Sequence, residues 1–290
     1  MAGQTKGILA YEVPERVAAY DADMEIMHPN RARMVEIALG VLPYPSDARL
    51  RAVDLGTGTA FLVHRFLSRF PESNVVAVDG ASSLVDLARA RLGTLAARVE
   101  FVVGDFRRLD LLLRGVAADA VLSSFALHHL TPDEKRSLLC HAAALLSPGE
   151  WFVNADLVIS EWPEVEERIQ AIRVEGILAR AAGRDPRFAD ARATRAYLDE
   201  LEANEGDQPL SLAQDLALAR EAGMVQTEVF WKEHREVVWG GGDRPSPDGI
   251  PRGRTKRETR YCGLLNPMVF VISRVFPPPL YPSHGSIEVR

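Results

Sequence analysis

The sequence has few cysteines, no long apolar run and no excess of positive charge. Only two of its 290 residues are cysteine, Cys140 and Cys262, and neither stands in a CxxC or Cys/His pattern. A zinc finger or a disulfide framework is therefore not indicated. No apolar stretch approaches the roughly 20 residues that a membrane-spanning helix needs, and the N-terminus lacks a basic-then-apolar signal pattern. We expect a cytoplasmic protein with no membrane partner.

The charge balance is acidic. There are 34 Lys and Arg against 40 Asp and Glu, which gives a formal net charge of -6. Such a chain has no general attraction to phosphate backbones, so no nucleic-acid partner is expected. One basic run, residues 252–260, opposes this balance. An RNA substrate stays open only if that run folds onto the site.

Short apolar runs alternate with amphipathic segments through the first half of the chain. Strands are expected at 50–55, 74–78, 99–103, 120–124 and 150–159. Helices are expected at 59–70, at 82–92, and from Thr131 to a turn at 147–149. Thr131 is followed by Pro and, at the third position, by Glu134, which together are typical of a helix start. This alternation predicts a parallel sheet with helices on both faces.

Helical segments stand before the sheet and interrupt it. Residues 15–42 have the pattern of two helices broken at His28-Pro29. Residues 161–207 form a long, charged helical stretch that breaks the strand–helix rhythm. We expect this stretch to be an insertion after the fifth strand and to serve as a substrate lid.

The end of the pattern predicts a helix at 212–222 and two strands, 225–231 and 235–239, that pair antiparallel. Gly240-Gly241-Gly242 and the residues to Gly253 are expected as a linker. The predicted organisation is an N-terminal helical cap (1–46), a main domain (47–242) with its lid insertion (161–207), and a C-terminal extension (243–290).

A glycine-rich turn, Asp54-Leu-Gly-Thr-Gly-Thr-Ala60, follows the first expected strand. Such a turn lets the backbone approach a ligand and aims helix N–H groups into the crevice beyond the strands. The dinucleotide-binding pattern requires a third glycine at the position of Phe61, which argues against a nicotinamide or flavin cofactor. Asp54 instead precedes the first glycine by two residues. A carboxylate there suits a ligand with an ammonium group, such as the methionine end of S-adenosylmethionine.

Acidic and aromatic residues follow the next strands. Asp79 ends the second strand, where a carboxylate can accept hydrogen bonds from both ribose hydroxyls or simply favour the start of the next helix. Asp105 and Phe106 follow the third strand, and such a pair can take an adenine amino group and stack on its ring. Residues 124–130, after the fourth strand, are expected to line the same crevice.

Together these residues resemble the class I S-adenosylmethionine-dependent methyltransferase family. The turn looks like the family's first motif, with Ala60 in place of the usual third glycine. The resemblance implies a Rossmann-like α/β fold with a seven-stranded, mostly parallel sheet closed by an antiparallel hairpin. It implies S-adenosyl-L-methionine as the cofactor. The cofactor-binding residues that it implies are Tyr20, Asp54, Gly56, Thr57, Gly58, Asp79, Gly80, Asp105, Phe106, Ser124 and Phe125.

Within the family the chain looks most like the small-molecule branch, including relatives of the carboxy-S-adenosylmethionine synthases. Tyr20-Asp21, residues 230–232 and Gly240-Gly241 carry that likeness. The Asp/Asn-Pro-Pro-Tyr pattern used for amino methylation of bases and glutamine is absent, and residues 123–126 occupy its place. The resemblance implies O-, N- or C-methylation of a small molecule, for instance in secondary metabolism. An RNA-modifying methyltransferase, a carboxy-S-adenosylmethionine-type enzyme and a non-catalytic cofactor-binding regulator stay open.

Methyl transfer needs a positioned acceptor and sometimes a base. As that base we rank His129 first and His28 second, followed by Asp156 and Glu175. His128 and His129 are adjacent, so they cannot both face one metal ion from a helix, and no carboxylate has ligand spacing. No metal is therefore expected. A homodimer that shares the lid stays open.

Overall fold

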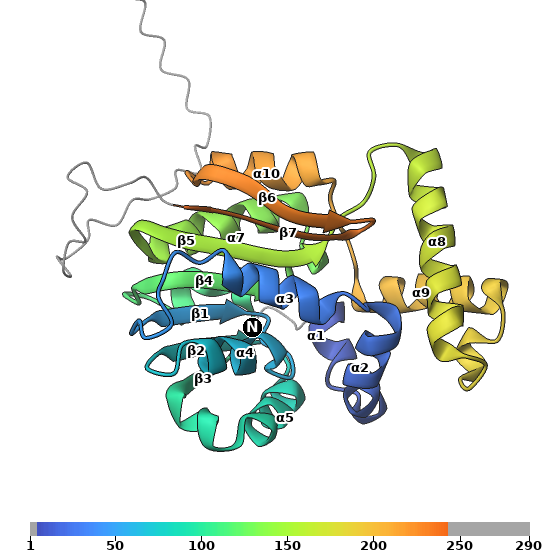
Figure 1. Ribbon diagram of the computed structural model, residues 1–290, viewed down its shortest axis with the longest axis horizontal. Coiled ribbons are helices and arrows are strands. Elements are labelled where there is room, and N and C mark those ends of the chain that lie inside the picture. The colour runs from blue at the N-terminus through green and yellow to red at the C-terminus, as the bar shows by residue number, and fades with distance from the viewer. Residues whose placement is uncertain (1–4, 243–290) are drawn as a thin grey trace, which may run out of the picture. The chain divides into compact units, whose positions relative to one another are not determined.

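The computed structural model describes residues 5–242 (Figure 1). Three sequence-based expectations lie outside the described residues: the basic run 252–260, the C-terminal extension 243–290 and the environment of Cys262. Among the described residues, no helix has both the length and the apolar character needed to cross a membrane.

Strands and helices alternate along the chain. The strands are β1 (Arg51–Leu55), β2 (Asn74–Asp79), β3 (Val99–Val103), β4 (Ala118–Ser124), β5 (Leu146–Leu157), β6 (Val225–Glu233) and β7 (Glu236–Gly242). The α-helices are α1 (Lys6–Ala10), α2 (Pro14–Met27), α3 (Arg31–Gly40), α4 (Phe61–Arg69), α5 (Ser82–Leu92), α6 (Leu109–Leu112), α7 (Pro132–Leu145), α8 (Pro163–Ala181), α9 (Ala191–Glu205) and α10 (Leu212–Glu221). Short 3-10 helices include η3 (Leu127–His129) and η4 (Pro186–Phe188).

All seven strands form one sheet in the order β3-β2-β1-β4-β5-β7-β6. The first five strands pair in parallel, whereas β7 runs antiparallel to both β5 and β6. The predicted Rossmann-like sheet with a closing hairpin is confirmed. The strand order reverses direction between β1 and β4, and in sheets of this kind ligands bind at that point, beyond the carboxyl ends of the strands.

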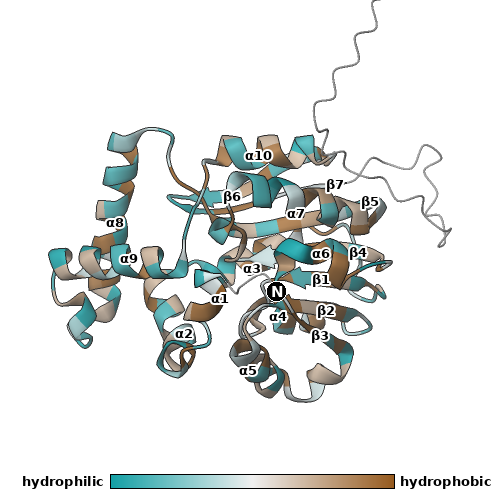
Figure 2. Ribbon diagram, turned by 180° about the vertical axis from the view of Figure 1, so that it is seen from behind, coloured by the Kyte–Doolittle hydropathy of each residue, from teal (hydrophilic) through white to brown (hydrophobic). Residues whose placement is uncertain are grey.

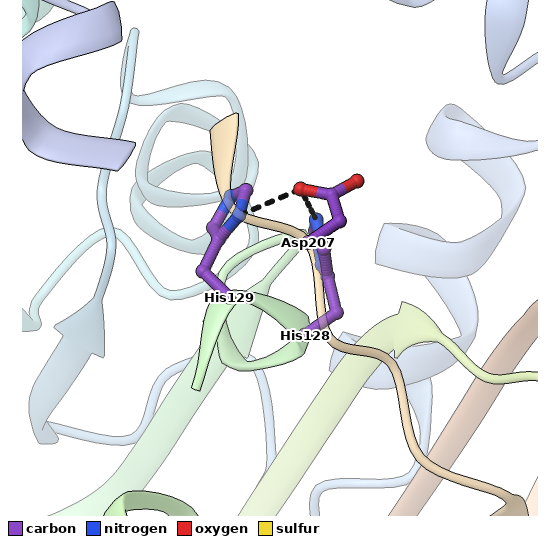
Figure 3. A group of neighbouring side chains, drawn as sticks. All are labelled: His128, His129 and Asp207. Atoms are coloured by element: carbon purple, nitrogen blue, oxygen red, sulfur yellow. Dashed lines mark ion pairs between the residues drawn. The ribbon is translucent and has the colours of Figure 1, made fainter. Parts of the chain in front are cut away.

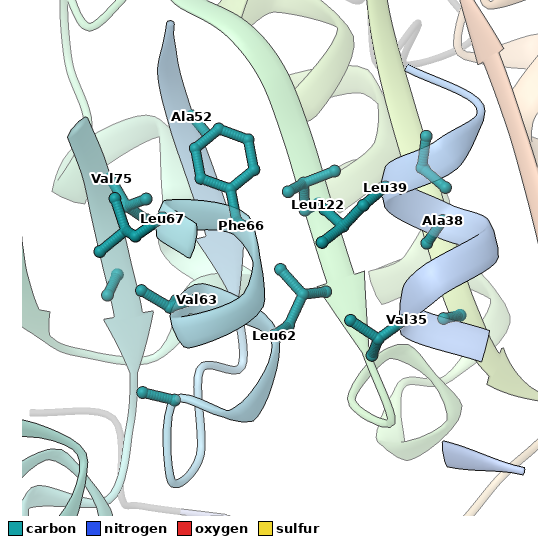
Figure 4. Close-up of a cluster of buried hydrophobic side chains, with 14 of the residues drawn as sticks. Val35, Ala38, Leu39, Ala52, Leu62, Val63, Phe66, Leu67, Val75 and Leu122 are labelled. Atoms are coloured by element: carbon teal, nitrogen blue, oxygen red, sulfur yellow. The ribbon is translucent and has the colours of Figure 1, made fainter. Parts of the chain in front are cut away.

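The two faces of the sheet are buried under separate sets of helices. Neighbouring residues of β1 point to opposite faces, so Ala52 joins the core beneath α3 and α4 while Val53 joins the core beneath α7 and α10. Figure 4 shows the first of these cores, to which α4 contributes Phe66, α3 contributes Leu39 and β4 contributes Leu122. Burial on both faces explains why the central strands β1, β2 and β4 are mostly apolar.

The turn expected at 147–149 lies inside a strand. β5 begins at Leu146, directly after α7, and pairs there with Ala118, but five residues later Trp151 pairs with Ala120. The extra residues bulge out of the ladder, and Gly149 takes a φ of +88° within the bulge. Pro148 and Gly149 correctly predict a local turn. The strand continues through that turn because β5 pairs with β4 on both sides of the bulge.

The prediction of a linker at Gly240-Gly241-Gly242 is wrong, because these glycines are the last residues of β7 and pair with β5. A Cβ atom on Gly240 would lie 2.6 Å from the carbonyl oxygen of Phe152. A Cβ atom on Gly241 would lie 3.0 Å from the Thr227 side chain of β6. Glycine at these positions therefore allows the neighbouring strands to approach closely, which is a known role of glycine within a strand.

Helices before the sheet and in the insertion pack on one another. α2 and α3 are separated at His28-Pro29, as predicted, whereas the short helix α1 was not expected. The insertion after β5 consists of α8, η4 and α9. Met27 of α2 shares a small apolar core with Ile177 of α8 and Leu198 of α9. Hydrophilic and hydrophobic residues alternate along α8 (Figure 2).

Candidate active site

A cavity of about 320 Å³ lies at the carboxyl ends of the parallel strands. Each of the first four strands contributes residues at or just beyond its carboxyl end. These are Gly56 and Gly58 after β1, Asp79 and Gly80 at β2, Asp105 and Phe106 after β3, and Phe125 and Ala126 after β4. The volume is within the range of small-molecule sites, about 300–1,000 Å³. The sheet topology therefore brings together the segments that the sequence singled out.

α1 and the end of α9 cover this cavity. Ile8 of α1 lies over Gly80, where a Cβ atom would approach the Ile8 side chain to 2.6 Å. Tyr11 donates a hydrogen bond from its hydroxyl to Glu205 at 2.9 Å, and Arg16 forms an ion pair with the same carboxylate at 2.7 Å. Both Tyr11 and Glu205 line the cavity. These contacts hold the N-terminal helices and the insertion together above the site.

The glycine loop uses left-handed backbone at three positions. Gly56 has φ +73° and Gly58 φ +54°, and a Cβ atom on Gly56 would lie 2.3 Å from the Cβ of Ala126. Glycine is therefore required at Gly56 for both conformation and space. Ala60, where the family pattern has glycine, also takes a left-handed conformation, with φ +60°. That conformation costs an alanine about 1–2 kcal/mol.

Asp54 is a buried carboxylate with one unsatisfied oxygen. The Thr57 hydroxyl donates to its Oδ2 at 2.5 Å, but its Oδ1 has no hydrogen-bond partner among residues 5–242. Burial raises the pKa of Asp54 to about 7. Asp54 borders a small recess of about 10 Å³ that also touches Tyr20, Thr57 and Ser124. An ammonium group is the partner that such a carboxylate lacks, so the residues present fit the methionine end of S-adenosylmethionine.

Asp79 and Asp105 lie in the wall of the cavity. Asp79 accepts backbone hydrogen bonds from Gly58 at 2.7 Å and Ala81 at 2.9 Å. Burial raises the pKa of Asp79, and these two hydrogen bonds oppose that shift. Asp105 accepts the backbone N–H of Arg107 at 3.0 Å and also pairs with its guanidinium. Both carboxylates are thus held in place by the chain itself.

The Tyr20-Asp21 pair of α2 fastens this helix to the glycine loop. Tyr20 is 8% exposed and lines the cavity beside Gly58. Asp21 accepts a hydrogen bond from the Thr59 hydroxyl at 3.0 Å and forms ion pairs with Arg31 and Arg91. The loop is therefore supported from outside by α2 as well as by the sheet.

The two adjacent histidines of η3 both face one carboxylate. His129 lines the cavity, and its Nδ1 lies 2.9 Å from Oδ1 of Asp207. His128 is buried behind it, with Nδ1 2.5 Å from Asp156 and Nε2 3.7 Å from the same oxygen of Asp207. Burial alone would lower the pKa of His128, but the carboxylates of Asp156 and Asp207 raise it to about 8.

The sequence-based argument against a metal ion assumed that His128 and His129 lie on a helix and have no carboxylate nearby. The structure shows that both assumptions are wrong. η3 is a 3-10 turn rather than an α-helix, so both rings can face one point. Asp207 supplies the carboxylate from 79 residues away in the numbering, between Gly206 and Gln208 of the cavity lining. No local spacing signals that approach, because it depends on how the insertion folds back.

The other base candidates lie away from the cavity lining. His28 is buried, its Nδ1 lies 3.2 Å from Glu236, and its ring packs on Phe125 at 4.8 Å between centroids. Burial lowers the pKa of His28. Asp156 faces His128, and Glu175 is exposed on α8. The cavity residues Tyr11, Glu205 and Arg107 were not anticipated, since nothing in their local sequence distinguishes them.

Comparison with known proteins agrees with this geometry. A family model described as a methyltransferase domain matches residues 52–149. That segment holds β1 to β4 and the glycine loop, which form the floor of the cavity. Residues 52–149 therefore form a methyltransferase domain, and the chain has the fold of the class I S-adenosylmethionine-dependent methyltransferases. A methyltransferase domain of this fold implies S-adenosylmethionine as the cofactor, and the residues around Asp54 fit it.

Individual relatives are distant. A malonyl-(acyl-carrier protein) O-methyltransferase of Acetivibrio thermocellus is 23% identical over 203 residues, which is 59% of this chain and 70% of that protein. An O-methyltransferase family protein from Burkholderia thailandensis has a TM-score of 0.56 at 21% identity, covering 83% of this chain and 66% of that one. PigF with SAH has a TM-score of 0.57 at 16% identity, covering 83% and 62%. The structural likenesses concern the fold.

Proposed function

We propose that this methyltransferase methylates a hydroxyl oxygen of a small-molecule acceptor, and that His129 takes the acceptor's proton. One observation carries the proposal. His129 lies in the wall of the same cavity as Gly56 and Asp79, with the Asp207 carboxylate 2.9 Å from its Nδ1. A hydroxyl is a poor nucleophile until its proton is removed, so a histidine–carboxylate pair beside the cofactor suits oxygen as the acceptor atom.

Residues at three strand ends would each bind a different part of the cofactor. Asp54 would bind the ammonium group, Asp79 the ribose hydroxyls, and Asp105 with Phe106 the adenine. When bound, S-adenosylmethionine supplies a methyl group on a positively charged sulfur, which is already activated for transfer. The protein's remaining tasks are to orient the acceptor, exclude water and hold the departing proton.

His129 is suited to hold that proton. When the ring carries its proton on Nδ1, beside the Asp207 carboxylate, the lone pair of Nε2 is left to act as the base. The carboxylate also stabilises the imidazolium that forms. Tyr11 packs edge-on against His129, with 6.2 Å between ring centroids, and limits the positions that the ring can take. α1 and the end of α9 cover the cavity and would keep water from the reacting atoms.

The comparisons support oxygen as the acceptor atom and do not identify the substrate. The Acetivibrio relative and the Burkholderia neighbour are both described as O-methyltransferases. The net charge of -6 favours a small molecule over a nucleic acid.

The test is turnover on a panel of small molecules that carry hydroxyl, amine or activated-carbon acceptors, followed by formation of S-adenosylhomocysteine. We expect methylation of a hydroxyl compound, and a fall in kcat of about 10²-fold or more in His129→Asn. S-adenosylhomocysteine should bind this variant as it binds the wild type. His64→Asn is the matched control, because His64 is exposed on α4. Full activity of His129→Asn, or binding of the cofactor with no turnover of any acceptor, would overturn the proposal.

A further inference from the structure

The cluster of His128, His129 and Asp207 has the geometry of a metal site (Figure 3). Nε2 of His128, Nδ1 of His129 and Oδ1 of Asp207 all lie within 4.8 Å of one another. The carboxylate oxygen is 2.9 Å from one ring nitrogen and 3.7 Å from the other. Tetrahedral Zn²⁺ with bonds of about 2.0–2.1 Å places its ligand atoms about 3.4 Å apart. The two distances lie on either side of that value.

His128 is held as metal-binding histidines usually are. Its Nδ1 lies 2.5 Å from Asp156 Oδ1, and its backbone N–H donates to the other oxygen of the same carboxylate at 3.1 Å. Asp156 is fully buried in β5, and these two contacts hold the His128 ring in its orientation. A carboxylate on one ring nitrogen fixes the tautomer and directs the lone pair of the other nitrogen at the ion. Here that lone pair faces Asp207.

The other two donor atoms are buried without hydrogen bonds. Nδ1 of His129 and Oδ1 of Asp207 lie 2.9 Å apart, yet within the described part of the chain neither atom has a partner in hydrogen-bond geometry. A buried polar atom that is left unsatisfied destabilises the folded protein. A cation between the three atoms would satisfy both, and the carboxylates of Asp207 and Asp156 would balance its charge.

We propose that His128, His129 and Asp207 bind one divalent transition-metal ion, of which Zn²⁺ is the best match, and that this ion switches the methyltransferase off. Two imidazoles and one carboxylate suit Zn²⁺ or Co²⁺, whereas Mg²⁺ and Ca²⁺ prefer oxygen ligands. Three protein ligands leave a fourth position for water.

The inhibitory part rests on the proposed role of His129 as the base. A metal on Nδ1 leaves the single proton of the neutral ring on Nε2. That nitrogen then has no lone pair with which to take the acceptor's proton. Metal and acceptor proton thus compete for the same imidazole, and chelation of the metal restores the base.

Binding is tested first on the full chain, without cofactor or acceptor. Zn²⁺ is titrated by calorimetry, and Co²⁺ by its visible absorption, which is intense when the ion is tetrahedral. We expect one ion per chain, and at least a tenfold loss of affinity in Asp207→Asn and in His129→Asn. His64→Asn should bind as the wild type does. Absence of binding, or equal affinity in Asp207→Asn with its fold intact by circular dichroism, would overturn the site.

Inhibition is tested second, with any acceptor that the chelator-treated protein methylates. We expect stoichiometric Zn²⁺ to lower kcat at least tenfold and a chelator to restore it. Metal binding with unchanged kcat would overturn the switch. If no acceptor is methylated at all, the proposed function fails, and the metal site is still decided by the titrations, since these need no turnover.

Discussion

Asp54→Asn is expected to make the unliganded protein more stable at alkaline pH while weakening its affinity for the cofactor. Asp54 is 1% exposed, accepts the Thr57 hydroxyl at 2.5 Å through Oδ2, and leaves Oδ1 without a partner among the described residues. Asparagine has nearly the same shape and keeps an oxygen for Thr57. The substitution therefore removes a buried charge and little else.

The size of the effect follows from the pKa. Burial raises the pKa of Asp54 to about 7 in the folded protein, against about 3.9 in an unfolded chain. Between these values the folded state holds the proton and the unfolded state does not. Stability therefore falls as pH rises through this window. At about 1.36 kcal/mol per pH unit, the penalty reaches at most roughly 4 kcal/mol above pH 7.

The assay is urea unfolding of both proteins near pH 5 and pH 8, with S-adenosylhomocysteine titrated calorimetrically near pH 8. The variant should be more stable at the higher pH, by up to about 4 kcal/mol, with a smaller gain at the lower pH. Its affinity for the ligand should fall by about ten- to a hundredfold, because the ammonium group loses a charged partner. Asp86→Asn is the control, since Asp86 is exposed on α5.

Two results would refute this reasoning. If Asp54→Asn lost stability equally at both pH values, the carboxylate would be a stabilising partner in the unliganded protein rather than an uncompensated charge. If the ligand bound equally well to the variant, Asp54 would not contact its ammonium group.

Three further substitutions test the loop and the core. Ala60→Gly should raise the free energy of unfolding by about 0.5–1 kcal/mol in urea, because glycine relieves the left-handed φ of +60° at a smaller entropic cost; a loss of stability would contradict this. Gly56→Ala should abolish detectable S-adenosylhomocysteine binding by calorimetry, since its Cβ would lie 2.3 Å from that of Ala126; retained affinity would show that the loop tolerates the shift. Lys135→Met should cost about 3–5 kcal/mol by leaving Asp215 buried and unpaired, and Lys135→Met with Asp215→Leu should recover much of that loss.

The sheet and the floor of the site could be predicted because their signals are local. Strands buried on both faces read as continuous apolar runs, and Thr131 and Glu134 form the expected reciprocal cap of α7. In a parallel sheet the residues after each strand meet at one edge. The position of Asp79 and Asp105 along the chain therefore sufficed to place them in one cavity with the glycine loop.

The cover of the site could not be predicted because it depends on tertiary contacts. α1 has only five residues, too few for a periodic pattern, and its place is set by contacts such as that of Tyr11 with Glu205. Asp207 approaches His128 and His129 only after the insertion has folded back. The glycines of β7 carry the same sequence signal as a linker, and only the neighbouring strands show that they serve close packing.

The cavity beyond β1 to β4 is expected to bind S-adenosylmethionine. A crystal structure of the full chain with S-adenosylhomocysteine tests it most directly. We expect the ligand's ammonium group at Asp54, its ribose hydroxyls on Asp79 and its sulfur on the side of the cavity that His129 lines. A ligand bound elsewhere, or one whose ribose does not reach Asp79, would contradict it.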